Sequence, residues 1–126
     1  MGQVSDILGK TVTQVEGMRE GSDRVIFTCS DSSRYIMYHH QDCCEDVRLE
    51  EVIGNPDDLL GEIVEARESS NHDDTGEFES ATWTFYNLGT QKGFVTLRWL
   101  GTSNGFYGEE VDFEPYDAHY HEDFCY

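Results

Sequence analysis

The densest group of side chains that could carry out chemistry lies in one short segment. The segment YHHQDCCED, which begins at residue 38, places two imidazoles, two thiols and three carboxylates within nine positions. In an extended chain, His40, Asp42 and Cys44 would share one face, and His39 and Cys43 the other. Neither face alone supplies the four nitrogen or sulfur ligands of a tetrahedral zinc site.

A zinc site on this segment would therefore need ligands from another part of the chain. The best combination joins His40 and Cys44 to His119 and His121, with Cys125 nearby. Adjacent cysteines chelate poorly and no Cys-x-x-Cys spacing occurs, so we favour a hydrogen-bonded turn with packed thiols. We expect no cofactor, and zinc is the alternative.

The same segment raises the alternative of a cysteine nucleophile. An imidazolium beside Cys43 or Cys44 would lower the pKa of the thiol and increase its reactivity. Sequence proximity to His39 or His40 does not establish that geometry. We therefore expect no catalytic residue here and favour a protein without enzymatic activity.

A second cluster, RWLGTSNGFY, begins at Arg98. An arginine beside aromatic and polar side chains suits a small anionic or planar ligand, through charge-assisted and stacking contacts. The ligand-binding alternative uses His40, Arg98, Ser103, Asn104 and Tyr107. Against it, Asn-Gly is typical of a tight turn, and an arginine among many acids favours a structural ion pair.

Other chemical motifs are absent from the sequence. It contains no phosphate-binding glycine loop, nucleophile elbow, paired zincin histidines or calcium-binding loop. With this many acidic residues, no particular pair of carboxylates indicates a hydrolytic site.

The chain is strongly acidic. Its 126 residues include 26 acidic and 8 basic residues, which give a formal net charge of −18. This charge argues against direct binding to nucleic acid or to an anionic membrane surface, because both rely on Lys and Arg. A hydrophobic content of 37% and an aromatic content of 13% still predict a folded core.

The charge is most one-sided after residue 101, where seven acids and no Lys or Arg occur. An acidic, aromatic terminal segment is either a frayed end or a peptide that docks on a partner. The residues predicted to bind a partner are Glu114, Tyr116, Asp117, Tyr120, Glu122, Asp123 and Phe124.

Alternating apolar residues predict short β-strands. The clearest are two hairpins, with strands at 24–29 and 34–40 and at 82–86 and 94–100. Further strands are expected at 10–16, 47–53 and 106–113, with 106–113 as the third member of a meander. Helical turns are expected near 5–9 and 57–61, and a mobile loop at 67–79.

These elements predict a mainly β (β-rich α+β) fold. We expect an antiparallel sandwich or partly open barrel of about seven short strands, with one or two short helical turns. Residues 1–114 would form one domain and residues 115–126 an acidic tail. No signal peptide or spanning segment is visible, and four cysteines without a signal indicate reduced thiols, so we expect a cytoplasmic protein.

Three runs of sequence resemble a known group of proteins. HHQDCCE, TWTFY and RWLGTSNGFY resemble a family of small, uncharacterised proteins encoded by tailed bacteriophages and prophages, over about residues 7–113. The resemblance implies a phage context and the cytoplasm of the host cell. It carries no assigned activity.

The leading functional hypothesis is a non-enzymatic, phage-encoded inhibitor of host machinery or defence, which would block a nuclease, a CRISPR effector (an anti-CRISPR role) or a polymerase. It would mimic the charge of DNA and occupy a basic groove on a host protein. The alternatives are a protein that binds or sequesters a small nucleotide signal, and a zinc-binding structural protein.

Overall fold

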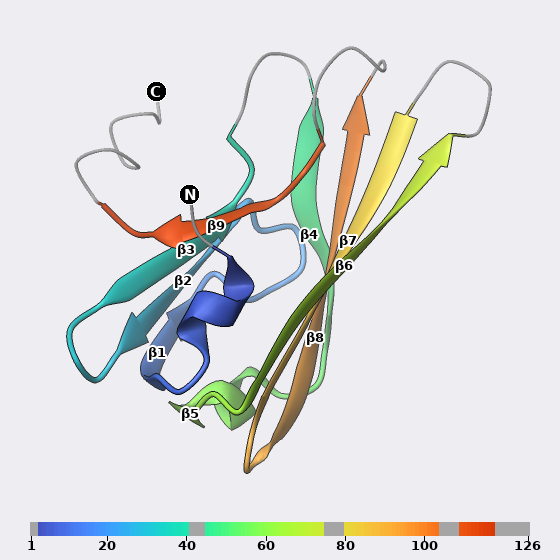
Figure 1. The fold of residues 1–126 in the computed structure, drawn as a ribbon. Coiled ribbons are helices and arrows are strands. Elements are labelled where there is room, and N and C mark those ends of the chain that lie inside the picture. The colour runs from blue at the N-terminus through green and yellow to red at the C-terminus, as the bar shows by residue number, and fades with distance from the viewer. Residues whose placement is uncertain (1–2, 41–44, 75–79, 104–108, 118–126) are drawn as a thin grey trace.

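The fold consists of two antiparallel β-sheets that pack face to face (Figure 1). The computed structural model describes residues 3–40, 45–74, 80–103 and 109–117. The elements in this part of the chain are η1 (Val4–Ile7), β1 (Thr11–Glu16), β2 (Arg24–Cys29), β3 (Arg34–Tyr38), β4 (Asp46–Ile53), η2 (Pro56–Leu59), β5 (Gly61–Glu62), β6 (Glu65–Asp74), β7 (Ser80–Thr90), β8 (Gly93–Ser103) and β9 (Asp112–Pro115). The predicted antiparallel, mainly β fold is confirmed, and the sheets do not close into a barrel.

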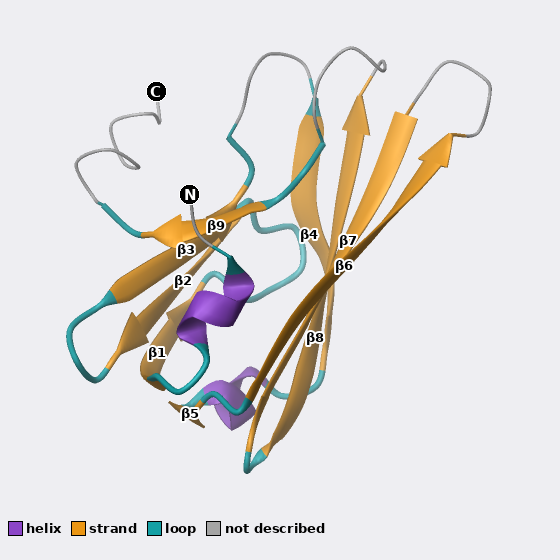
Figure 2. Ribbon diagram, in the orientation of Figure 1, coloured by secondary structure: helices purple, strands orange, loops and turns teal. Residues whose placement is uncertain are grey.

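The two sheets differ in their connectivity. One has five strands in the order β5-β1-β2-β3-β9, and the other has four in the order β4-β8-β7-β6. Both η1 and η2 are single 3-10 turns (Figure 2). Neither of them has the length and apolar character that a membrane-spanning helix requires.

Both predicted hairpins are confirmed, and their turns have clear local causes. Between β2 and β3, the Asp31 carboxylate accepts hydrogen bonds from the backbone N–H and the hydroxyl of Ser33. Lys10 Nζ lies 2.8 Å from the other Asp31 oxygen, and these hydrogen bonds hold the pKa of Asp31 below its ordinary value. Between β7 and β8, the Lys92 N–H donates to Thr90 Oγ1 at 3.1 Å.

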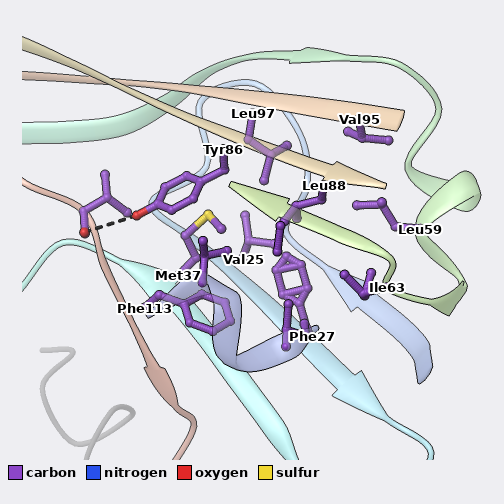
Figure 3. Close-up of a cluster of buried hydrophobic side chains, with 14 of the residues drawn as sticks. Val25, Phe27, Met37, Leu59, Ile63, Tyr86, Leu88, Val95, Leu97 and Phe113 are labelled. Atoms are coloured by element: carbon purple, nitrogen blue, oxygen red, sulfur yellow. Dashed lines mark hydrogen bonds between the residues drawn. The ribbon is translucent and has the colours of Figure 1, made fainter. Parts of the chain in front are cut away.

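The hydrophobic core fills the space between the sheets (Figure 3). Val25, Phe27 and Met37 of the five-stranded sheet belong to the same buried cluster as the inward residues of β7 and β8. Trp99 is fully buried, and its Nε1–H donates to the sulfur of Met37 across the interface at 3.2 Å. Period-two alternation along β8 thus places one face of that strand in the core.

A turn of the five-stranded sheet also covers the outer edge of β4. The Gly21 N–H donates to the Leu49 carbonyl, and the Leu49 N–H donates to the Ser22 carbonyl, both at 2.7 Å. These bonds satisfy backbone groups on the side of β4 that faces away from β8. They tie the two sheets together at this edge and hold β4 in place.

The loop expected at 67–79 is wrong over its first part. Residues 67–74 continue β6, which pairs with β7 from Glu65 opposite Gly89 to Asp74 opposite Ser80. The polar composition of this segment indicated a loop because β6 is an edge strand whose side chains from Arg67 to His72 are exposed. The backbone ladder with β7 stabilises this strand without an apolar face of its own. Residues 75–79 lie outside the described residues.

The meander expected after β8 is also wrong. The strand that follows is Asp112–Pro115, and it pairs with β3 in the other sheet, with Met37 opposite Phe113. Its apolar side chains cause the switch, because Phe113 stacks on Tyr35 with ring centroids 5.4 Å apart. The chain therefore crosses from one sheet to the other between Ser103 and Asp112.

Candidate functional site

The residues that flank the two chemically rich segments lie at one end of the sandwich (Figure 1). Asp46, at the start of β4, pairs with Thr102 near the end of β8. His39 follows β3, and Glu109 precedes β9. The polar residues described below therefore come from both sheets and meet at this end.

His39 and Glu45 form a buried ion pair. His39 Nε2 lies 2.6 Å from Glu45 Oε2, and the two side chains are 4% and 0% exposed. His39 Nδ1 lies 2.6 Å from the carbonyl oxygen of Glu110. Because a carbonyl oxygen can only accept, Nδ1 donates to Glu110, and Nε2 lies against the Glu45 carboxyl group. His39 thus connects β3, β4 and the segment before β9.

Glu109 is the centre of a second buried network. Its carboxylate accepts hydrogen bonds from Thr82 Oγ1, at 2.7 Å, and from the hydroxyl of Ser103. Since the Thr82 hydroxyl donates to Glu109, it accepts from His72 Nδ1, which lies 3.1 Å away. Glu109 itself is 6% exposed. The network joins β6, β7 and β8 to the segment that crosses to the other sheet.

A glycine makes room for this network. A Cβ atom on Gly101 would lie 2.7 Å from the carbonyl oxygen and 2.8 Å from the Cβ of Glu109. Neither atom belongs to the flexible end of a side chain. Gly101 is therefore needed for the close approach of Glu109 to β8.

These contacts have a chemical consequence. Both nitrogens of His39 are occupied by oxygen atoms of neighbouring residues, so neither nitrogen is open to a substrate or a metal ion. Each Glu109 oxygen accepts from a neighbouring hydroxyl. Within the described part of the chain, every buried side-chain nitrogen or oxygen has a hydrogen-bond partner. The networks therefore hold the two sheets together at this end.

Two further carboxylates, Glu68 and Asp112, influence a buried tyrosine, Tyr86. Partial loss of hydration, with a smaller contribution from Asp112, raises the pKa of Glu68, and partial burial raises the pKa of Asp112 above its ordinary value. Burial and these two carboxylates together raise the pKa of Tyr86. The Tyr86 hydroxyl donates to the Val111 carbonyl at 3.2 Å (Figure 3), so it stays neutral and serves as a structural donor.

The predicted metal ligands are only partly described. The backbone N–H of His40 lies 3.3 Å from Asp112 Oδ2, and its ring lies 6.5 Å from the ring of Tyr38. Cys44, His119 and His121 lie outside the described residues. Within the described ranges, no group of three or more His, Cys, Asp or Glu side chains could hold a metal ion.

The predicted ligand-binding residues lie on different faces. Ser103 is buried against Glu109, on the inner face of the four-stranded sheet. Arg98 alternates with the inward Leu97 and Trp99 and lies on the outer face, where it forms the expected ion pair, with Glu51. Asn104 and Tyr107 lie outside the described residues.

The start of the predicted partner-binding segment is attached to the five-stranded sheet. Glu114, in β9, accepts a hydrogen bond from the Tyr38 hydroxyl at 3.0 Å. The Tyr116 N–H donates to the Arg34 carbonyl at 2.8 Å, and the Arg34 guanidinium lies 4.6 Å from the centre of the Tyr116 ring. Asp117 is exposed. The remaining predicted residues, Tyr120, Glu122, Asp123 and Phe124, lie outside the described residues.

Most of the positive charges are paired within the molecule. All eight Lys and Arg residues lie in the described ranges, and six of them form ion pairs with carboxylates of the same chain. The pairs are Lys10–Asp31, Arg24–Asp23, Arg34–Glu16, Arg48–Asp46, Arg67–Glu65 and Arg98–Glu51. Outside these six pairs, the chain has 20 of its 26 acidic residues and 2 of its 8 basic residues.

The outer face of the four-stranded sheet carries an aromatic cluster. The rings of Trp83 and Phe85 stack with centroids 6.4 Å apart, and the Arg98 guanidinium lies 4.7 Å from the Trp83 centroid and 5.8 Å from that of Phe85. All three residues are half-buried. This stacking combines aromatic and cation–π contacts on one sheet surface.

Sequence reasoning missed Glu109 and the role of Glu45. Both are acids among many, and no local spacing marks an acid as buried. A useful signal was the glycine at 101, which stands between two strand residues and opens space for a close neighbour. A second useful signal was His39, because a buried imidazole needs a hydrogen-bond partner for each of its nitrogens and a nearby acid can supply one.

A comparison with protein families identifies the family of this chain. It belongs to the family described as a domain of unknown function (DUF7448), which matches residues 5–113. The match spans both sheets, including the polar end of the sandwich. No curated protein and no solved structure gives a significant match.

Proposed function

We propose that this member of the DUF7448 family is a non-enzymatic binding protein that uses its negative charge to engage a basic surface on a protein partner. Within this proposal, the chain is encoded by a bacteriophage or prophage. It acts in the host cytoplasm, where it occupies a groove that normally binds nucleic acid and inhibits a host or defence protein.

The observation that carries the proposal is the internal pairing of the positive charges. Six of the eight basic residues form ion pairs with the chain's own carboxylates. The surplus acids therefore dominate the electric field around the molecule. A basic partner is the kind of surface that this field attracts.

The roles of the buried acids support the same conclusion. Glu45 and Glu109 are hydrogen-bonded inside the sandwich and hold its elements together. The acids left for a partner are the exposed ones, such as Glu20, Glu50 and Glu62. Complementary charge accelerates association and makes it sensitive to salt, because ions screen the attraction between exposed groups.

The test is capture of a partner from a lysate of the host bacterium across a salt series. We expect a basic protein to be retained at about 0.05 M NaCl and released near 0.5 M, since the Debye length falls severalfold over that range. A nucleic acid that competes with the chain for the captured protein would support the mimicry. Failure to retain any basic protein at the lowest salt would refute the proposal.

Matched variants locate the binding charge. One variant replaces the tail acids, as Asp117→Asn, Glu122→Gln and Asp123→Asn. A second changes the net charge equally on the body of the domain, as Glu20→Gln, Glu50→Gln and Glu62→Gln. If the C-terminal segment binds the partner, the first variant weakens capture more than the second. Equal effects would assign binding to the overall charge.

A further inference from the structure

We infer that the outer face of the four-stranded sheet is a self-association surface, through which two copies of this chain pack face to face. This face consists of the outward side chains of β4, β6, β7 and β8. The five-stranded sheet packs on the opposite side (Figures 1 and 2), so no described sheet covers it.

The face is rich in large apolar side chains. Period-two alternation and strand register place five of them there: Ile53, Trp83, Phe85, Phe94 and Leu100. Phe94 is 63% exposed and Ile53 is 49% exposed. A sheet surface with this content is unusual for an acidic monomer, and aromatic residues with arginine are the commonest anchors of protein interfaces.

The charge of the face points to a second copy as the occupant. Among the strand residues whose side chains the structure describes, the outward charges at regular register positions are those of three ion pairs, Arg48–Asp46, Arg67–Glu65 and Arg98–Glu51. Asp73, opposite Ala81, adds one acid at an outward register position of β6. Glu50 lies at the β4 bulge and Lys92 in the β7–β8 turn, so the margins of the sheet carry one charge of each sign at these two positions. The face is therefore close to neutral in a chain whose net charge is −18. Two such chains repel each other wherever acids meet, and this surface lets them approach with the least repulsion.

The size of the face also suits a dimer. Four strands spaced by about 4.8 Å, each about ten residues long at about 3.3 Å per residue, cover about 600 Å² before side-chain relief is counted. A stable interface buries about 800 Å² on each partner. A two-fold axis near the centre of the sheet, where Phe85 lies opposite Arg98, would bring the aromatic cluster of each copy against that of the other.

Dimerisation of this chain should depend on salt in the opposite way to its binding to a basic partner. Salt screens the repulsion between two acidic copies, so it should tighten the dimer, whereas it should weaken capture of a basic protein. The two proposals can therefore fail independently of each other.

The experiment is sedimentation of the full chain over a concentration series at low and high salt. We expect a monomer–dimer equilibrium that shifts toward the dimer as salt increases. Leu100→Glu, on the outer face, should weaken the dimer by about tenfold or more, because it places like charges across the interface. The matched control is Leu8→Glu, a change of the same kind at a 45% exposed leucine outside the sheet, which should leave the equilibrium unchanged.

A second variant keeps the test decisive if Leu100→Glu fails to fold. Phe94→Glu alters the most exposed large apolar residue on this face and should weaken the dimer similarly. Three results would overturn the inference. The first is a wild-type chain that stays monomeric up to about 1 mM, a concentration far above the dissociation constants of stable interfaces. The second is a dimer that survives Phe94→Glu. The third is a dimer that Leu8→Glu disrupts as strongly as Phe94→Glu does.

Discussion

Replacing His39 with alanine tests how the chemically rich end of the sandwich is held together. His39 and Glu45 are 4% and 0% exposed, with their charged atoms 2.6 Å apart. His39→Ala would leave a buried carboxylate without its cationic partner, and breaking such a pair costs about 3–5 kcal/mol. For a domain of this size, the loss corresponds to a decrease in Tm of roughly 10–20 °C.

Chemical denaturation in urea measures the change directly. The wild type, His39→Ala, Glu45→Ala and the double variant form a cycle that isolates the energy of the pair. We expect the double variant to lose much less stability than the sum of the two single losses, because it leaves no buried charge without a partner.

An exposed ion pair on the neighbouring strand provides the control. Arg48 and Asp46 lie 2.9 Å apart in β4, with 52% and 56% of their side chains exposed. Arg48→Ala should cost less than about 1 kcal/mol, because water and salt screen an exposed pair. If His39→Ala also costs less than about 1 kcal/mol, or if the two single losses add fully, the argument for a buried, coupled pair is wrong.

Three other changes give measurable outcomes. Gly101→Ala should destabilise the fold by about 1–3 kcal/mol in urea denaturation, because the new Cβ would lie 2.7 Å from the Glu109 carbonyl oxygen. Burial raises the pKa of the Asp112 carboxyl group above its ordinary value of 3.8. The ionised form is therefore less favourable in the folded protein than in the unfolded chain, and Asp112 lowers the free energy of unfolding as the pH rises above 3.8. Asp112→Asn should remove this loss. In urea denaturation, the free energy of unfolding of the variant should exceed that of the wild type by more at pH 7 than at pH 3.5. Burial also raises the pKa of the Cys29 thiol, so a chain in which Cys29 is the sole cysteine should react with a thiol reagent only on unfolding.

Much of the fold follows from local sequence patterns. The two hairpins were predictable because β-branched and aromatic residues alternate with polar ones on both sides of short turns. Edge strand β6 was not, because its exposed side chains carry no apolar alternation and its stability comes from pairing with β7. The partner of β9 depends on packing against Tyr35, a contact between positions far apart in the sequence.

The candidate site divides in the same way. Sequence reasoning identified two chemically rich segments, and the structure places their flanking residues at one end of the sandwich. It did not identify Glu109, because burial of a carboxylate depends on distant partners such as Thr82 and Ser103. It also grouped Arg98 with Ser103, whereas an odd separation along one strand puts them on opposite faces of the sheet.

The acids of this chain form two populations, and the distinction governs how its function should be tested. Glu45 and Glu109 are buried in hydrogen-bonded networks, so neutralising either of them changes the fold before it changes any partner. Exposed acids such as Glu20 and Glu62 make little contribution to packing, so their loss changes the field that a partner meets. A variant chosen by net charge alone would mix the two effects. Variants chosen by burial separate them, because only the exposed set should change capture while leaving the urea midpoint in place.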